Sequence, residues 1–192
     1  MANHRAAAEV LLFWFGEGEA YGKRDKRWFV KDQAFDKLIR DRFLGLYEAL
    51  AAGSCRDWLQ RPDSCLARVL VLDQFPRNMF RGTPRAFATD AAALDAARHG
   101  LAQGFDRAML PVERMFLYLP FEHSESLADQ IEACRLMEPL RAFAETADAY
   151  DYALRHRDII ERFGRFSHRN SILGRASTPE EIEFLKQPGS GF

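Results

Sequence analysis

Apolar residues recur at helical spacing along most of this sequence, and this periodicity limits the folds open to the chain. The clearest run follows Asp32 and ends before Gly53: Phe35, Leu38, Ile39, Phe43, Leu46, Tyr47 and Leu50. Spacing of three and four residues is typical of an amphipathic helix. No stretch shows sustained alternation rich in β-branched residues. We therefore predict an all-α fold of antiparallel helix pairs, arranged as a bundle or as a solenoid-like stack.

Proline and capping residues predict where the helices begin and end. Pro76 and Pro120 each follow an apolar helical run, and we expect them to stop those helices because proline lacks an N–H donor and clashes with the preceding turn. Ser126 and Asp129 have the spacing of a capping box, and residues 178–181 (TPEE) combine a cap with proline at the first helical position. The predicted helices cover residues 6–15, 33–52, 62–75, 90–99, 111–119, 127–138, 140–163 and 180–186, with a break or kink at Pro139.

Charge, apolar content and cysteine usage indicate a single soluble domain over residues 1–192. Hydrophobic residues make up 47% of the chain and include 16 Phe, enough to fill a sizeable core without disulfides. The 27 Lys and Arg nearly balance the 28 Asp and Glu, so no global field steers the chain to nucleic acid or to a membrane. The three cysteines lack C-x-x-C spacing, and no apolar run suits a membrane span or a signal peptide. We expect a soluble, cytoplasmic protein.

The first of three polar stretches covers residues 72–82 (LDQFPRNMFRG). Its polar residues surround a predicted helix end: Asp73, Arg77, Asn78 and Arg81. The simpler interpretation is helix termination, with Asp73 paired to a nearby arginine and Asn78 turning the chain. The functional interpretation is an anion clamp, because an arginine fork matches a carboxylate or a phosphate through two parallel hydrogen bonds.

The second stretch, residues 121–126 (FEHSES), precedes a predicted helix N-terminus. In a purely structural role these residues cap the helix, and Glu125 complements its dipole. In a chemical role, His123 with Glu122 or Glu125 forms a general acid–base pair. Histidine suits this role because it titrates near neutral pH and a carboxylate fixes its tautomer.

The third stretch, residues 155–175 (RHRDIIERFGRFSHRNSILGR), contains six arginines and two histidines. With Asp158 and Glu161 subtracted, the arginines leave a formal charge of about +4. Four polar residues fall in the predicted loop after the helix: Arg165, His168, Arg169 and Asn170. Arginines that neighbouring apolar side chains hold rigidly suit anion binding, whereas a solvated helix face with intrahelical ion pairs is the structural alternative. We expect no metal and no cofactor, because the histidines lack metal-ligand spacing and the arginines oppose a cation.

Taken together, these stretches resemble the DUF924 family of uncharacterised, largely bacterial proteins. The matching segments spread over nearly the whole chain: WFG at 14–16, LDQFPRNMFRGTPRAFATD at 72–90, FLYLPFEHSE at 116–125, HRDIIERFGRFSHRNSILGR at 156–175, STPEE at 177–181 and the closing PGSGF. The resemblance implies an all-helical, tetratricopeptide-like fold without consensus repeats, and no established activity. One departure is Ser167, where we expect proline in RFPHRN. Serine there should loosen the turn before His168.

Our favoured hypothesis is that the three stretches converge on a pocket between helices. The pocket would bind a small phosphate- or carboxylate-bearing anion, and acid–base chemistry there is a further hypothesis. The arginines expected to hold the anion are Arg77, Arg81, Arg165 and Arg169. His123 or His168 would move protons, oriented by Glu122 or Glu125. Three further residues complete the predicted ligand-binding set, the first two by positioning the arginines: Asp73, Asn78 and Asn170.

Two alternatives stay open at this point. A non-catalytic, tetratricopeptide-like interaction module would use the same arginines to grip an acidic peptide or protein partner. In the other alternative, the arginine–carboxylate groups only tie helices together. The sequence gives no ligand, no reaction class and no oligomeric state, and it leaves open whether the protein is an enzyme.

Overall fold

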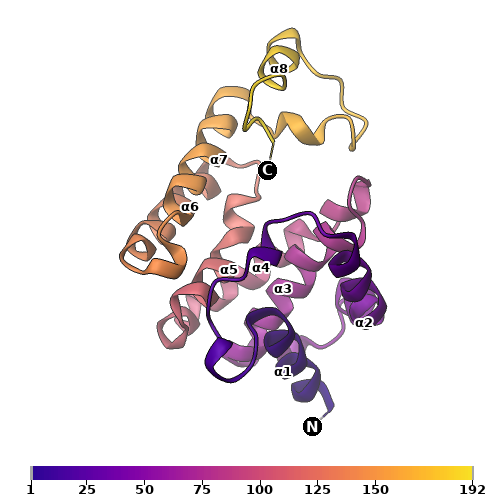
Figure 1. Ribbon diagram of the computed structural model, residues 1–192, viewed down its shortest axis with the longest axis vertical. Coiled ribbons are helices and arrows are strands. Elements are labelled where there is room, and N and C mark those ends of the chain that lie inside the picture. Colours follow the sequence, from indigo (N-terminus) through magenta and orange to yellow (C-terminus); the bar gives the residue numbers. More distant parts are fainter. Residues whose placement is uncertain (1, 192) are drawn as a thin grey trace.

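Eight α-helices build the described part of the chain, residues 2–191, in this computed structural model, which gives side chains from residue 5 onward (Figure 1). The helices are α1 (Ala2–Phe15), α2 (Gln33–Ala51), α3 (Pro62–Met79), α4 (Asp90–Ala102), α5 (Pro111–Glu122), α6 (Leu127–Met137), α7 (Ala149–Phe163) and α8 (Pro179–Phe184). Short 3-10 turns join them, and no strand occurs among the residues described. The all-α prediction is confirmed, while the tetratricopeptide-like superhelix stays a prediction.

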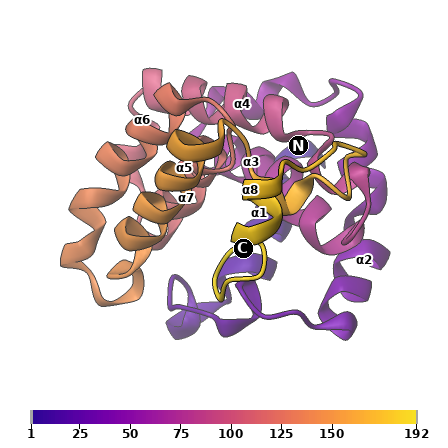
Figure 2. The ribbon, with the colours of Figure 1, turned by 90° about the horizontal axis from the view of Figure 1, so that it is seen from above.

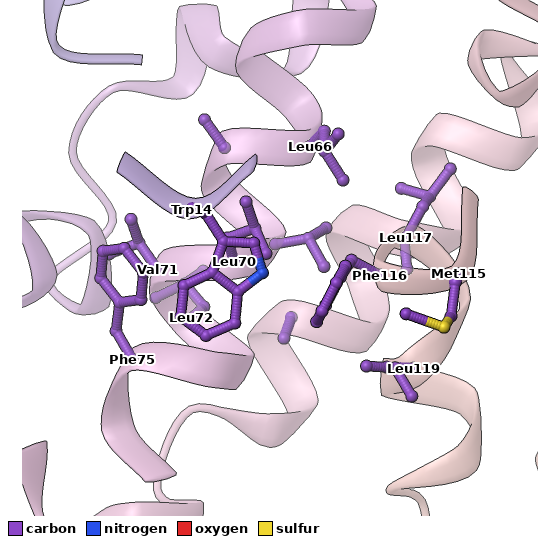
Figure 3. Packing of buried hydrophobic residues seen from close by; sticks show 14 of the residues in the cluster. Trp14, Leu66, Leu70, Val71, Leu72, Phe75, Met115, Phe116, Leu117 and Leu119 are labelled. Carbon is purple, nitrogen blue, oxygen red and sulfur yellow. The ribbon is translucent and has the colours of Figure 1, made fainter. Parts of the chain in front are cut away.

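Helix α3 lies at the centre of the molecule, where α1, α2, α4 and α5 all pack against it (Figure 1). Its apolar residues face in several directions, so a helix of this composition is stable only when it is covered on several sides. Figure 3 shows the resulting core, in which Trp14 of α1 lies between Phe75 of α3 and Phe116 of α5. The ring centroid of Trp14 is 5.6 Å from that of Phe75 and 5.5 Å from that of Phe116. This core fixes the ends of α3 and α5 relative to one another.

Small residues let α4 approach α3 and α5 closely. Ala93, Ala97 and Gly100 are buried on α4. A Cβ atom added at Gly100 would lie only 3.3 Å from Sγ of Cys65 and 3.4 Å from a methyl group of Leu117. Close packing of small residues allows short interaxial distances. The alanine-rich segment therefore serves helix packing, as its composition predicts.

Two prolines do not stop their helices. Helix α3 continues through Pro76 to Met79, and α5 continues through Pro120 to Glu122. The sequence-based prediction of both helix ends is thus wrong. Pro76 leaves the carbonyl of Leu72 without its helical N–H partner, and the Thr89 hydroxyl donates a hydrogen bond of 2.6 Å to that oxygen. A tertiary contact therefore offsets part of the cost of proline inside α3.

Helix starts were predicted with mixed success. Asp32 caps α2 by accepting hydrogen bonds from the backbone N–H groups of Ala34 and Phe35, and Thr178 forms the expected capping box at α8. Ser126 precedes α6 but its side chain makes no capping bond. Two 3-10 turns, Glu138–Ala142 and Ala144–Thr146, stand in place of the helix that was expected to resume at Leu140. Pro139 breaks the pattern, and the chain regains an α-helix only at Ala149.

The C-terminal segment, residues 164–191, has a small apolar cluster of its own. Ile159 and Ile160 of α7 pack with Phe166, and Phe163 and Phe184 lie against this group. The main core is a separate cluster. Seen from above, the segment lies over the middle of the molecule, between the α5–α7 row and α2 (Figure 2). Polar contacts join this segment to the body. Arg169 contacts the His123 carbonyl and Asp90, and Arg175 contacts Glu125.

Across residues 2–191, every helix is too short or too polar to cross a membrane.

Candidate functional site

The three polar stretches meet where the C-terminal ends of α3 and α5 face residues 165–175. His123, at the C-terminal end of α5, contacts Asp73 of α3 through its ring and Arg169 through its backbone carbonyl, at 2.7 Å and 3.1 Å. We call the ionisable groups gathered there the polar cluster: Asp73, Arg77, Asp90, Glu122, His123, His156, His168 and Arg169. The packing of α3 against α5 brings the first two stretches together, and the C-terminal segment adds the third.

Asp73 and His123 form a hydrogen-bonded acid–imidazole unit. Asp73 is 0% exposed, and 16% of the His123 side chain is exposed. Burial alone would raise the pKa of Asp73, but the charge and hydrogen bond of His123, with Arg77 and Gln74 nearby, hold that pKa below its ordinary value. The carboxylate accepts from Nδ1 of His123, so Nδ1 carries the proton and Nε2 is the position left for proton exchange.

A second acid–imidazole pair lies beside the first. Oε1 of Glu122 is 3.1 Å from Nδ1 of His156, and both side chains are buried. Burial, with the nearby Asp73 carboxylate, raises the pKa of Glu122 to about 8. Burial lowers the pKa of His156 to about 3, although the Tyr152 carbonyl, which accepts from Nδ1, favours the charged ring. At neutral pH this pair is therefore uncharged, whereas the carboxylate of Asp73 is ionised.

Two arginines share one carboxylate at the edge of the cluster. Nη1 of Arg77 lies 2.8 Å from Oδ1 of Asp90, and Nη1 of Arg169 lies 3.4 Å from Oδ2. The guanidinium of Arg169 also lies between two aromatic rings, 4.8 Å from the centroid of Phe87 and 4.4 Å from that of Phe166. Burial, with the charge of Arg77, lowers the pKa of Arg169 to about 10. Because its exposed fraction is only 6%, this is a cation withdrawn from water and held rigidly.

One donor of Arg169 has no acceptor. Its Nε is buried, and no hydrogen-bond partner for it lies within residues 2–191. Buried N–H groups are nearly always paired, and an unpaired one in a charged side chain is costly. This donor is the feature of the polar cluster that most directly calls for an added acceptor.

His168 lies at the outer edge of the polar cluster. Burial, together with the charges of Arg169 and Arg77, lowers the pKa of His168 to about 4. The tail of the chain passes beside it, since a Cβ added at Gly191 would lie 3.7 Å from Cβ of His168. Ser167, where proline was expected, is buried and donates a hydrogen bond to Glu181. The serine therefore has a defined partner in the turn before His168.

Several predicted site residues lie outside the polar cluster. Arg81 makes a two-pronged contact with Asp36 of α2, and Asn78 donates to the same carboxylate. Asn78 therefore positions no arginine of the cluster. Arg165 binds Glu181 through two hydrogen bonds of 2.7 Å. These contacts join α2 to α3 and close the C-terminal segment on itself.

Two further predicted residues belong to the same ties. Glu125 accepts from the Arg175 guanidinium and from the backbone N–H of Phe166. The side chain of Asn170 donates to Ser177 and accepts from Arg175. The expectation that Glu122 or Glu125 orients His123 is wrong, because Asp73 contacts that ring. Chain neighbours on a helix point in different directions, so Glu122 reaches His156.

His156 and Asp90 were missed by sequence reasoning. His156 lies three and four residues before Ile159 and Ile160, on the apolar side of α7, and this spacing was the available signal of a buried histidine. Asp90 was taken only as a helix start. Its position in the first turn of α4 gave no sign that two distant arginines would converge on it.

Two cavities lie away from the polar cluster. One, of about 420 Å³, is lined by Phe15, Gly16, Ala20 and residues 23–27, and a smaller one of about 180 Å³ lies between residues 21–23 and residues 110–112. Three of the four cations in residues 23–27 already pair with carboxylates on the surface. Among the residues described, no three His, Cys, Asp or Glu side chains are grouped so as to hold a metal ion.

Comparison with known proteins agrees with the sequence resemblance. The family model described as a bacterial protein of unknown function (DUF924) matches residues 10–189. None of the curated proteins matches the chain. A solved structure of a protein of unknown function from Agrobacterium tumefaciens is similar at a TM-score of 0.87 and 43% identity, over 96% of this chain and 98% of that one. Because the family model covers most of the sequence, the chain belongs to the DUF924 family, whose function is unknown.

Proposed function

We propose that the polar cluster binds a small anionic ligand bearing a carboxylate or a phosphate, and that His123 exchanges a proton with it. The buried Arg169 guanidinium, with its unaccepted Nε donor, is the observation that carries this proposal. Rigid arginines recognise carboxylates and phosphates through paired hydrogen bonds. Arg77 contributes a second guanidinium at the same edge, where 20% of its side chain is exposed.

Acid–base chemistry is the finer part of the proposal. Neighbouring carboxyl groups whose pKa values are pushed apart commonly divide the roles of acid and base. Here the pKa of Asp73 is lowered and that of Glu122 is raised to about 8. An imidazole fixed by an ionised carboxylate suits a general base, with Nε2 of His123 as the accepting atom. Glu122 remains protonated at neutral pH and keeps a second negative charge away from Asp73.

A thermal-shift screen against small carboxylates and phosphate monoesters tests the binding proposal. At least one compound should raise the melting temperature of the wild-type protein in a saturable manner. Arg169→Gln should weaken that ligand about 10- to 100-fold, the equivalent of losing one charged hydrogen bond of about 1.5–3 kcal/mol. Arg135→Gln is the matched control, because Arg135 forms an exposed pair with Glu132 away from the polar cluster.

The opposite outcome is equally clear. If Arg169→Gln lowers the melting temperature but leaves every ligand affinity unchanged, the arginine only ties helices together. Circular dichroism of the variant separates that result from loss of the fold. Should Arg169→Gln not fold, Arg77→Gln is the second variant, since Arg77 is less buried and shares Asp90.

An interaction module that grips an acidic partner has less support. Of the arginines expected to do so, Arg81 pairs with Asp36 and Arg165 with Glu181, and Arg175 pairs with Glu125 in the same way. An acidic peptide would have to compete with each of these contacts. These contacts suit the structural alternative, in which arginine–carboxylate pairs only tie helices together, and we assign that role to these three arginines.

A further inference from the structure

We infer that the larger of the two cavities, at the end of α1, is a further anion-binding site, which takes a small molecule bearing a phosphate group. The cavity measures about 420 Å³ and shares no residue with the polar cluster, so this inference goes beyond the proposed function and does not depend on it. Cavities that hold small molecules commonly measure about 300–1,000 Å³. The inference follows from the charge of the lining and from the way the lining is held.

Basic side chains dominate the lining of this cavity. Four cations and a single carboxylate contribute to it: Lys23, Arg24, Lys26, Arg27 and Asp25. Four positive charges less one leave a formal charge of +3, in a chain whose net charge is -1. A phosphate monoester carries a charge of about −1.5 to −2 near pH 7. Such a molecule matches the excess of positive charge in the lining.

Glycines after α1 give the cavity its shape. Gly16 and Gly22 have φ values of +87° and +77°, in the left-handed region that favours glycine. The backbone N–H of Gly22 donates a hydrogen bond of 3.0 Å to the Phe15 carbonyl, so the chain turns back on the end of α1. A Cβ added at Gly16 would lie 3.2 Å from the Ala20 carbonyl oxygen. This turn places residues 23–27 beside the end of α1, where together they line the cavity.

The core anchors both ends of the basic segment, residues 23–27. Before it, Gly22 packs so closely on Leu110 that an added Cβ would lie 2.8 Å from a methyl carbon of the leucine. After it, Trp28 is buried, and its Nε1 donates a hydrogen bond of 2.9 Å to the Trp14 carbonyl. Side chains held in place before a ligand arrives bind it better, because ordering them on binding costs entropy.

Ion pairs orient both arginines of the segment without using all of their donors. Arg24 binds Asp148 through two hydrogen bonds, of 2.6 Å and 2.8 Å. Arg27 binds Asp25 in the same two-pronged manner. A guanidinium has more N–H donors than a two-pronged contact uses, so each arginine keeps donors for a ligand. The Asp148 carboxylate is not among the groups that line the cavity.

Lys26 is the cation most available to a ligand. Among residues 2–191, it is the one cation of the lining that forms no ion pair, whereas Lys23 has Glu145 at 3.3 Å. Its side chain is exposed. A lysine ammonium carries several donors and no acceptor, so an anion in the cavity can bind it without displacing a carboxylate.

Nuclear magnetic resonance titration of the wild-type protein with glycerol 3-phosphate tests this inference. Glycerol, which lacks the phosphate, is the matched probe, and constant ionic strength keeps the screening of charges equal. Near pH 7.5, where the phosphate is mainly dianionic, glycerol 3-phosphate should produce saturable shifts of the backbone amide signals within residues 16–27. Glycerol should produce none at the same concentrations.

Single substitutions identify the cations involved. Lys26→Gln should weaken glycerol 3-phosphate binding about fivefold, the most that one exposed charge pair commonly contributes. Lys37→Gln is the matched control, because it removes an equal charge from an exposed ion pair on α2 and should leave the affinity unchanged. Asp25→Asn removes the carboxylate from the lining and releases Arg27, so it should tighten binding.

The position of the shifts separates this site from the polar cluster. Shifts confined to residues 121–126 and 165–175 would support the proposed function alone and overturn the cavity site, as would the absence of any shift within residues 16–27. Equal shifts with glycerol, or an unchanged affinity in Lys26→Gln, would overturn it too. Saturable shifts within residues 16–27 that weaken in Lys26→Gln support the cavity site, whether or not the polar cluster binds the same probe.

Discussion

Glu122 and His123 are neighbours in the chain but belong to different acid–imidazole pairs. Glu122 reaches His156 on α7, while the ring of His123 reaches Asp73 on α3. The carboxyl group of the first pair is protonated and that of the second is ionised. Glu122 is sealed from solvent, whereas Asp73 lies near Arg77 and contacts His123 and Gln74. The protonation of this region is therefore set residue by residue.

Glu122 should make the protein less stable as pH rises. Its ordinary pKa of 4.5 is raised to about 8 in the folded state, so between those values the unfolded state binds fewer protons than the folded state. Stability then falls with rising pH, at a limiting slope of about 1.4 kcal/mol per pH unit. Glu122→Gln should remove this slope. The free energy of unfolding of the variant, relative to that of the wild type, should therefore increase from pH 5 to pH 9.

Urea unfolding of both proteins across that range measures the effect. Glu132→Gln, on the exposed face of α6, provides the control and should follow the wild-type slope. Parallel pH profiles for wild type and Glu122→Gln would show that Glu122 is not the titrating group.

Arg81→Gln should leave anion binding intact. The Arg81 side chain is 38% exposed and bonds Asp36, outside the polar cluster. Exposed ion pairs contribute about 0–1 kcal/mol, so the loss of stability should stay within that range. Calorimetric titration with the ligand found by screening checks the affinity, and a melting curve checks the stability. A large fall in affinity would place Arg81 in the site after all.

The sequence predicted which stretches meet at the site, but not which side chains contact one another there. The density of charge in residues 72–82, 121–126 and 155–175 pointed to stretches that do meet. The choice of His123's partner depends on the rotation of α5 against α3, which is set by packing and not by spacing within either stretch. Asp90 could not be identified as a site residue for the same reason, because Arg77 and Arg169, which contact it, come from other elements.

At the scale of elements, Pro76 and Thr89 should be energetically coupled. Thr89→Val removes the hydroxyl that serves the Leu72 carbonyl and should cost about 1–3 kcal/mol, because that oxygen is then buried without a donor. Pro76→Ala restores an N–H to the helix at the position that Leu72 needs. In the Pro76→Ala background, Thr89→Val should therefore cost less.

A double-mutant cycle by chemical denaturation measures this coupling. Additive effects of the two substitutions would mean that the hydroxyl does not compensate for proline. Thr83→Val is a matched control, since its hydroxyl donates to the Phe80 carbonyl and has no link to Pro76.

The sequence predicted which segments are helical, but it did not predict where α3 and α5 end, because rules based on local sequence omit tertiary contacts. Periodic apolar residues identified α2 and α3, and the capping residues Asp32 and Thr178 marked true starts. Proline was treated as a stop because an isolated helix loses a hydrogen bond and gains a clash there. In α3 a threonine 13 residues further along the chain replaces part of the loss, and no local rule contains that contact.

At the scale of the whole molecule, the C-terminal segment should open before the core does. Its apolar cluster is small and separate, and polar contacts such as Arg175 with Glu125 join it to the body. Free energies of local opening are low where few apolar contacts are buried. Native-state hydrogen exchange should give a lower opening free energy for amides of α8 than for those of α3.

Glu125→Gln should widen that difference. It weakens the link to Arg175 and to the Phe166 amide, so exchange in α8 should accelerate by the equivalent of about 1–2 kcal/mol, with α3 unchanged. Glu132→Gln should affect neither helix. Uniform exchange across α3 and α8 would instead show one cooperative unit.

Because α5 continues through Pro120, the rotation of its end sets the direction of both Glu122 and His123. Both acid–imidazole pairs therefore depend on the same helix end. A single residue inserted into α5 before Glu122 would turn its end by about 100° and would separate both acid–imidazole pairs in one step. The same insertion in the exposed loop at residues 52–54 alters no such alignment. A change of length at the end of α5 therefore disrupts both acid–imidazole pairs together, whereas a substitution alters one pair at a time.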